Sequence, residues 1–320
     1  MSTPVPESGA ASTPAEELAR ALVRASDGTV RAILLYGSHL LRSAAPDRHS
    51  AVDLVVVVDD YRAFHRALSA AGELPRPPWL MSALAHVLPP NVIAFAPEEG
   101  RAAIAKCLVV RSDHFERALG PNPPDHFLLG RLVQKVAVTW ARTEADARWV
   151  DERIRAAHRG VLRWMAPYLE ASFDAQALGR RMLEVCYRGE LRPEAGDRAE
   201  QIFQAQAPHF ERAFGPVLEE AEQEGIVRPS GEGYCLRTAP GRRDARRWRR
   251  HFRRSKLRAT LRWLKHTVTF ANWLPYVVRK VERHTGREIH LTPLERKLPL
   301  LFLWPRAVYV LCTRPSRRDS

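Results

Sequence analysis

Residues 34–60 read LLYGSHLLRSAAPDRHSAVDLVVVVDD, and this stretch decides the fold. The apolar run at 32–36 predicts a buried strand that ends at Gly37 and Ser38. A polar loop follows, and then an aspartate opens a second apolar run at 54–58, which predicts another strand. We therefore expect two short neighbouring strands in a small α/β sheet, with polar groups where the first ends and the second begins.

These polar groups have a pattern that suits a nucleotide triphosphate. Gly37 lets the backbone approach a ligand closely, and the Ser38 hydroxyl and the amides of a helix expected to follow can face negative charge. Asp53, fifteen residues after Ser38, is placed to hold Mg²⁺ against the phosphates. The pattern indicates a nucleotidyl-transfer site, and an ordinary βαβ turn is the alternative.

A second metal-binding carboxylate is harder to place. Many nucleotidyltransferases carry one two residues after the first, but Val55 occupies that position here. Asp59 and Asp60 end the strand, about 20–23 Å from Asp53 at ~3.3 Å per residue. We keep Asp59 as a secondary metal candidate, and a loop contact or a helix cap, the cap above all, is the favoured alternative.

Positive charge is concentrated at one end of the 320-residue chain, whose formal net charge is +14. Residues 241–320 hold 22 Lys or Arg and 5 Asp or Glu, a net of +17, whereas residues 1–240 have a net of −3. The basic surplus therefore belongs to the last quarter, and the rest has the composition of an ordinary globular protein.

The four cysteines are too far apart for a zinc knuckle or a redox pair, which favours reduced thiols and a cytoplasmic setting: Cys107, Cys186, Cys235 and Cys312. No signal peptide is visible in the small, polar residues at the start, which predict disorder. No run reaches the ~20 apolar residues that would cross a bilayer.

The chain divides into four predicted segments. Residues 1–14 form a disordered start, 15–122 an α/β domain with a small mixed sheet, 123–240 a helical domain, and 241–320 a basic tail. The boundary near 122 is the PNPP interruption. Helical spacing predicts helices in the third segment, at 127–140, 146–168, 174–187 and 199–223. A short hairpin is expected after them, with strands at 225–227 and 233–236. Helices followed by such a hairpin resemble a winged helix.

The tail has the pattern of a helix that lies on a membrane surface. Residues 242–266 contain twelve Lys or Arg and one acid, and the leucines fall on one helical stripe. There are two alternatives. The tail could be an arm that binds nucleic acid, or its apolar runs, 298–311 among them, could pack against the rest of the protein. The residues predicted to bind the membrane are Trp248, Phe252, Arg253, Arg254, Leu257, Leu261, Trp263 and Leu264.

Three cations are candidates for contact with the triphosphate or with an acidic head group. Arg131 and Lys135 are four residues apart on a predicted helix and so share a face, and Lys106 is expected nearby. The alternative is a solvated helix face. His65 is a possible nucleotide contact, although a histidine beside a core helix face is more often packed.

Ordered blocks between residues 34 and 218 resemble the mitochondrial-type phosphatidate cytidylyltransferases, the CDP-diacylglycerol synthases of the translocator-maintenance class, which include bacterial members. After the YGS turn the blocks are DLVVVVDDYRAFHRAL (53–68), AKCLVVRSDHFERAL (105–119), FLLGRLVQKVAV (127–138), VCYRGELR (185–192) and HFERAFGPVL (209–218). The tail is similar only in being basic and amphipathic.

The resemblance implies an enzyme that joins CTP to phosphatidic acid, releasing pyrophosphate, with Mg²⁺ as cofactor. It implies a nucleotidyltransferase domain, a winged-helix domain and a C-terminal membrane-binding segment, hence a peripheral protein on the cytoplasmic face of a membrane, with no stable nucleic-acid partner. Asp53 would be the catalytic metal ligand. The alternatives are transfer to RNA, a protein or a small alcohol, or a non-catalytic nucleotide- or nucleic-acid-binding module.

Overall fold

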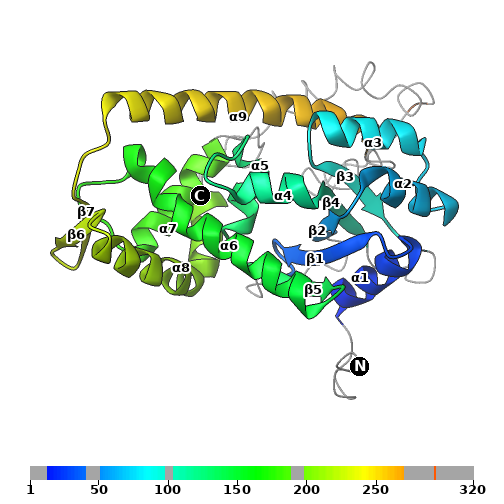
Figure 1. Cartoon of the computed structure of the whole chain (residues 1–320), viewed down its shortest axis with the longest axis horizontal. Coiled ribbons are helices and arrows are strands. Elements are labelled where there is room, and N and C mark those ends of the chain that lie inside the picture. Colours follow the sequence, from blue (N-terminus) through cyan, green and yellow to red (C-terminus); the bar gives the residue numbers. More distant parts are fainter. Residues whose placement is uncertain (1–12, 41–50, 98–103, 189–197, 270–291, 293–320) are drawn as a thin grey trace. The chain divides into compact units, whose positions relative to one another are not determined.

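The computed structural model describes residues 13–40, 51–97, 104–188, 198–269 and 292 (Figure 1). The chain forms two compact units, residues 1–269 and 270–320. Apart from residue 292, the described ranges belong to the first unit, and the predicted apolar runs after residue 269 lie outside them.

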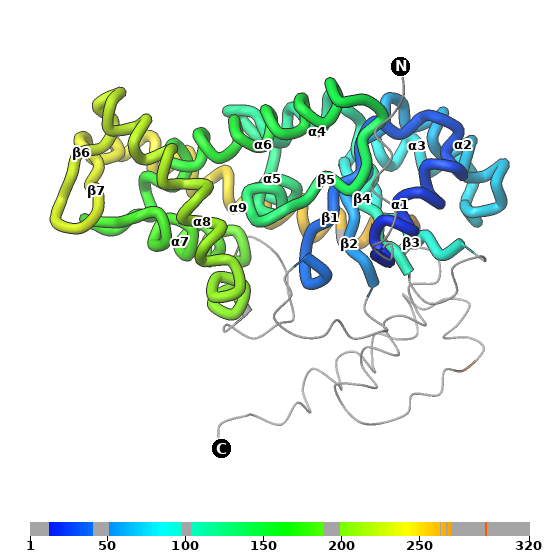
Figure 2. Tube along the Cα trace, turned by 90° about the horizontal axis from the view of Figure 1, so that it is seen from below, coloured from blue at the N-terminus to red at the C-terminus, as the bar shows by residue number. Residues whose placement is uncertain are grey.

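A five-stranded mixed sheet forms the core of this unit, in the order β3-β4-β2-β1-β5 (Figures 1 and 2). Its central strand β2 runs parallel to β4, and the other neighbouring pairs are antiparallel. Since β1 lies antiparallel beside β2, the segment between them is not a βαβ crossover. The strands are β1 (Val30–Tyr36), β2 (Val52–Val58), β3 (Asn91–Phe95), β4 (Ala105–Arg111) and β5 (Ala137–Ala141).

The sheet follows from its apolar runs. Residues 54–58 of β2 are inaccessible to solvent, because a central strand with both faces covered must be apolar throughout. Three helices pack with these strands in one core: α1 (Pro14–Ala25), α2 (Tyr61–Ala70) and α3 (Pro78–Val87). A mixed α/β fold, as expected, is what the chain adopts.

Helices and a hairpin make up the second part of the chain. The hairpin of β6 (Val227–Ser230) and β7 (Gly233–Leu236) forms close to its predicted position, directly after the helices. The helices are α4 (Ser112–Leu119), α5 (His126–Leu132), α6 (Glu144–Met165) with a 3₁₀ turn (Ala166–Tyr168), α7 (Ala175–Arg188) and α8 (Arg198–Gln223).

One predicted helix is wrong in its second half. Residues 127–140 were expected to be helical throughout, but α5 ends at Leu132 and β5 begins at Ala137. The edge of β1 needs a hydrogen-bonding partner, and the β-branched residues of this segment suit a strand. The sheet therefore extends past the predicted domain boundary at 122.

The basic segment begins as one long helix, α9 (Arg242–Thr269), which belongs to the same compact unit rather than to a separate tail. Ion pairs join it to Asp125, which accepts from Arg258 and Arg262 at 2.8 Å each. Lys265 donates to the Pro90 carbonyl at 2.8 Å and to Asn91 at 2.9 Å. Three basic residues in the second half of α9 therefore face the protein rather than solvent.

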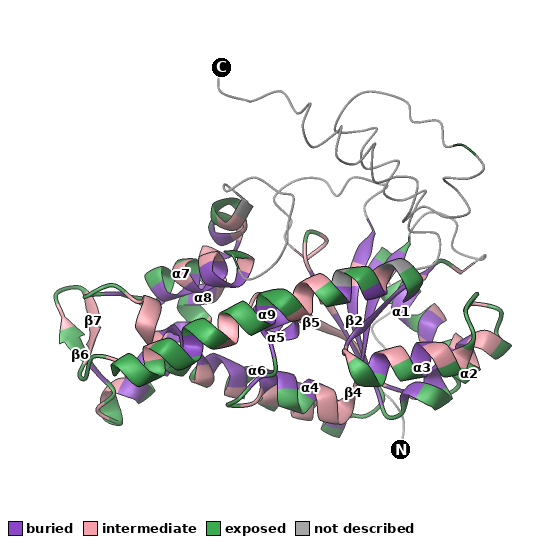
Figure 3. Cartoon of the chain, turned by 90° about the horizontal axis from the view of Figure 1, so that it is seen from above, coloured by how far each residue is buried: buried purple, intermediate pink, exposed green. Residues whose placement is uncertain are grey.

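The predicted membrane face of α9 is partly wrong. Trp248 is buried, and the Phe252 ring stacks on His126 with ring centroids 3.8 Å apart, so both aromatic side chains face the protein. Exposed positions run along the whole helix (Figure 3) and include Arg253, Arg254, Leu257, Leu261 and Leu264. The side chain of Trp263 lies outside the described part.

Candidate active site

Asp53 lies near the start of β2, between polar residues on both neighbouring strands. It pairs with Tyr36 across the antiparallel ladder to β1 and with Lys106 across the parallel ladder to β4. This register brings three predicted features together, because Gly37 and Ser38 follow Tyr36 directly. The Asp53 side chain is 27% exposed, so it opens to solvent and is not sealed in the core.

Gly37 makes the closest approach to this carboxylate. Its φ is +80°, and a Cβ atom built there would lie 2.9 Å from Asp53 Oδ2. Both facts require glycine, since other residues adopt a positive φ at a cost and a side chain would push the carboxylate away. The backbone then turns through residues 38–40, with the Leu40 N–H bonded to the Gly37 carbonyl at 3.1 Å. Residues 38–40 form a turn, and residues 41–50, in which the expected helix would continue, lie outside the described part.

The polar neighbours of Asp53 are at long range. Lys106 Nζ is 3.8 Å from Oδ1, and the Tyr36 hydroxyl is 3.5 Å from the same oxygen. Ordinary hydrogen bonds span about 2.7–3.2 Å. Asp53 is therefore oriented by these two groups without being enclosed by them, and its oxygens can still accept a ligand.

This donor set fits a metal that arrives with its substrate. Mg²⁺ usually takes one or two protein carboxylates and completes its shell with water and substrate phosphates. Asp53 can supply one such oxygen, and Val55, where a second carboxylate would stand, is fully buried. Among the described residues no group of three or more His, Cys, Asp or Glu gathers as a preformed metal site.

The carboxylates at the other end of β2 have structural partners. Asp59 accepts from Arg142 at 2.6 and 3.4 Å. The cap of α2 is Asp60, which accepts from the Ala63 N–H at 2.9 Å. Our preferred assignment of the cap to Asp59 was thus one residue off. The ion pair and the strand length separate Asp59 from the Asp53 site.

The pairing of Arg131 with Lys135 on one helix face is also wrong, because α5 ends between them. The Arg131 guanidinium stacks over the Phe127 ring at 3.9 Å and donates to the Phe127 carbonyl. Lys135 lies in the connection to β5, where its backbone N–H donates to Gln206 at 2.8 Å.

α9 supplies a histidine to this region that its basic, amphipathic pattern concealed. The His266 ring lies 6.0 Å from that of Phe127. Burial, and to a smaller extent the charges of nearby cations that include Lys106 and Arg131, lowers the pKa of His266 to about 2. The charges of cations on β4 and α5 thus act on this ring of α9. Only the fold brings residue 266 to residue 106.

His65 has the packed role that we favoured. It is fully buried, its Nδ1 lies 3.1 Å from the Ser82 hydroxyl, and burial lowers its pKa to about 4. The residues 47 and 49 of the loop between β1 and β2, and residues 189–192 of the VCYRGELR block, lie outside the described part.

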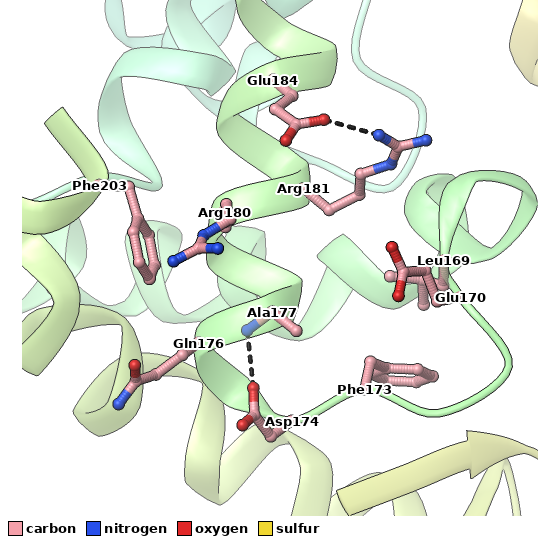
Figure 4. Close-up of a pocket in the computed structure, with 10 residues that line it drawn as sticks. All are labelled: Leu169, Glu170, Phe173, Asp174, Gln176, Ala177, Arg180, Arg181, Glu184 and Phe203. Carbon is pink, nitrogen blue, oxygen red and sulfur yellow. Dashed lines mark hydrogen bonds and ion pairs between the residues drawn. The ribbon is translucent and has the colours of Figure 1, made fainter. Parts of the chain in front are cut away.

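A separate pocket lies among the helices (Figure 4). Its wall includes Asp174, Arg180, Arg181, Glu184 and Phe203. Arg181 pairs with Glu184 at 2.6 Å, and Arg180 stacks over Phe203 at 4.5 Å. Because these groups already satisfy one another and none lies on the sheet, this pocket is not the predicted site.

One structural observation bears on the predicted association with membranes. Within the described ranges, every helix is too short or too polar to cross a bilayer.

Comparison with known proteins adds little to this geometry. No protein-family model and no curated protein matches the chain. Among solved structures, a nucleotidyltransferase-like protein from Exiguobacterium sibiricum is similar over 92% of this chain and 89% of that chain, with 12% identity and a TM-score of 0.27. A likeness at this level carries no argument about activity.

Proposed function

We propose that this protein is a Mg²⁺-dependent nucleotidyltransferase that transfers the cytidylyl group of CTP to phosphatidic acid at a membrane surface. The observation that carries the proposal is the approach of Gly37 to Asp53 across β1 and β2, with Lys106 on the third strand. A backbone that needs glycine next to an open carboxylate is a place where phosphates and a divalent ion can meet. The resemblance of the sequence blocks supplies the identity of the two substrates.

The chemistry suits a site with few proton acceptors. The second pKa of a phosphomonoester is about 6, so the attacking oxygen of phosphatidate is already largely ionised at neutral pH. The site must bring two anions in line and neutralise the departing pyrophosphate. Cations and a metal serve this purpose better than a general base.

Each side chain then has a defined task. Asp53 would hold the metal, which when bound would supply positive charge to the triphosphate. The Gly37 and Ser38 turn accepts the outer phosphates against its backbone. Lys106 orients Asp53 and would supply positive charge next to the reacting groups, and Arg131, which stacks over Phe127, is a further candidate for contact with an acidic group.

An alcohol acceptor would make different demands. A hydroxyl has to lose its proton during attack, and that step usually needs a second carboxylate or a histidine near the first acid. At the position two residues after Asp53, β2 carries the buried Val55. This feature favours an acceptor that is already ionised.

The test is an assay of purified full-length protein with CTP, Mg²⁺ and vesicles containing phosphatidate. We expect pyrophosphate and CDP-diacylglycerol in equal amounts, and loss of both with the Asp53→Asn variant. Replacing phosphatidate by diacylglycerol tests the acceptor, and replacing CTP by ATP, GTP or UTP tests the base. No pyrophosphate release with any acceptor, together with wild-type CTP binding by Asp53→Asn, would rule out the proposal.

A further inference from the structure

The first half of α9 forms one wall of an open pocket of about 410 Å³ that is distinct from the Asp53 site. The opposite wall is the connection between α4 and α5, at Asn122 and Pro123. None of the lining residues comes from β1, β2 or β4. The basic lining residues are Arg243, Arg246, Arg247, Arg250, His251 and Arg254.

These arginines are placed by helical spacing. Positions 243, 247, 250 and 254 follow one another at intervals of four, three and four, and position 246 lies four before 250, which puts all five on one face of α9. No carboxylate lies among the residues that line the pocket. Like charges this close on a helix repel each other, so the array is unfavourable until an anion joins it.

Two further contacts show that the pocket has a built wall. Arg247 donates to Asn122 Oδ1 at 2.8 Å, which fixes one guanidinium against the α4–α5 connection. The buried Trp248 ring packs edge-on against His251, with ring centroids 5.3 Å apart. In the described part of the chain, His251 Nε2 is buried and has no hydrogen-bond partner. A ring nitrogen in this state is satisfied when it donates to a ligand oxygen.

We propose that this pocket binds a phosphate group of the phosphomonoester class, held by the Arg246 and Arg250 side chains with Arg247 and His251 at its base. Guanidinium groups match phosphate oxygens in pairs, and a volume of this size admits a phosphate with a small substituent. The site does not depend on the proposed reaction, because its residues take no part in it.

The same helix face indicates where such a phosphate could come from. After residue 254 the outward positions become apolar, and Leu257, Leu261 and Leu264 are each about half exposed. Phosphate contacts followed by an apolar row fit a lipid whose head group enters the pocket. A soluble phosphate has the same head chemistry, so the experiment has to separate the two sources.

The experiment uses full-length protein and two charge-matched double variants. Arg246→Ala/Arg250→Ala removes two arginines from the pocket, and Arg249→Ala/Arg253→Ala removes two exposed arginines of the same helix that do not line it. Flotation with phosphatidylcholine vesicles with and without phosphatidate measures the lipid source. Calorimetric titration with glycerol 3-phosphate measures the soluble source, and circular dichroism checks that both variants fold.

We expect the pocket variant to lose about tenfold or more in phosphatidate-dependent binding, as a lost bidentate phosphate contact would, and the control pair to lose about twofold. Weak binding of glycerol 3-phosphate by wild type and by the control assigns the site to lipid, and tight binding that only the pocket variant loses assigns it to a free phosphomonoester. Equal losses in both variants would mean diffuse charge attraction and would overturn the pocket.

Discussion

Asp53 and Asp125 are both carboxylates beside basic side chains, yet the protein treats them differently. Asp125 is 6% exposed and is enclosed by Arg258 and Arg262, each at 2.8 Å, and by the Phe127 N–H at 3.0 Å. Asp53 is 27% exposed, and Lys106, its nearest cation among the described residues, stays at 3.8 Å. One carboxylate is closed by the fold, and the other is left open.

The difference separates a structural ion pair from a place for a ligand. Burial alone would raise the pKa of Asp125, but the charges and hydrogen bonds of Arg262 and Arg258 outweigh it and lower the pKa. Arg262 is itself fully buried, so each partner depends on the other. At Asp53 the glycine turn does the opposite: it keeps space clear next to the oxygens. The following substitutions test whether Asp125 contributes mainly to stability and Asp53 mainly to activity.

The largest expected effect is on stability, from Asp125→Asn. The substitution keeps the shape of the side chain but leaves Arg262 charged and buried without its counter-ion, which should cost about 3–5 kcal/mol of unfolding free energy. Urea unfolding followed by circular dichroism measures it. A change below about 1 kcal/mol would mean that the carbonyl of Pro89, which also accepts from Arg262, suffices to hold this charge.

Two controls sharpen the result for Asp125. Arg262→Met in the Asp125→Asn background removes the stranded charge and should recover part of the lost stability. Because the folded pKa of Asp125 is lowered, its contribution is complete above the ordinary value of about 3.9 and disappears as the pH falls through the folded pKa. The unfolding free energy of Asp125→Asn should therefore fall less steeply than that of wild type below about pH 4.

Asp53→Asn should show the reverse pattern. Under the proposed function this carboxylate would hold the metal, so its loss would remove electrostatic stabilisation of the transition state, and we expect the rate of pyrophosphate release to fall about 100-fold or more. Stability should change by less than about 1 kcal/mol, since the Lys106 pair is partly exposed and long. If Asp53→Asn instead lost as much stability as Asp125→Asn and kept the wild-type rate of pyrophosphate release, Asp53 would have the structural role that we assign to Asp125.

Gly37→Ala tests the space kept beside Asp53. A positive φ costs a non-glycine residue about 1–2 kcal/mol, and the new Cβ would lie 2.9 Å from Asp53 Oδ2. Gly28→Ala is the matched control: its φ is +71°, but its Cβ would meet no atom within 4 Å. Both variants should lose similar stability, whereas only Gly37→Ala should lose nucleotide affinity and rate. Equal rates in the two would show that the contact with Asp53 is unimportant.

The open site was easier to foresee than the closed one. Asp53 and Gly37 are found by strand-ending patterns that act over a few residues, and valine runs identify the strands that carry them. Asp125 and Arg262 are 137 residues apart, so no local pattern joins them. The basic helix also misled for a physical reason: amphipathic spacing shows that two faces differ, but buried ion pairs let the charged residues turn inward while Leu257 and Leu261 remain exposed.

The smallest expected effect comes from Asp59→Asn, which has the same charge change as Asp53→Asn, directly after the end of the same strand. Asp59 is 47% exposed and paired with Arg142, and exposed pairs contribute about 0.2–1 kcal/mol. The rate and its Mg²⁺ dependence should match wild type, because the ion pair lies at the opposite end of β2 from Gly37. A raised Mg²⁺ requirement would instead place Asp59 in the metal site and would mean that the carboxylates at both ends of this strand serve one reaction.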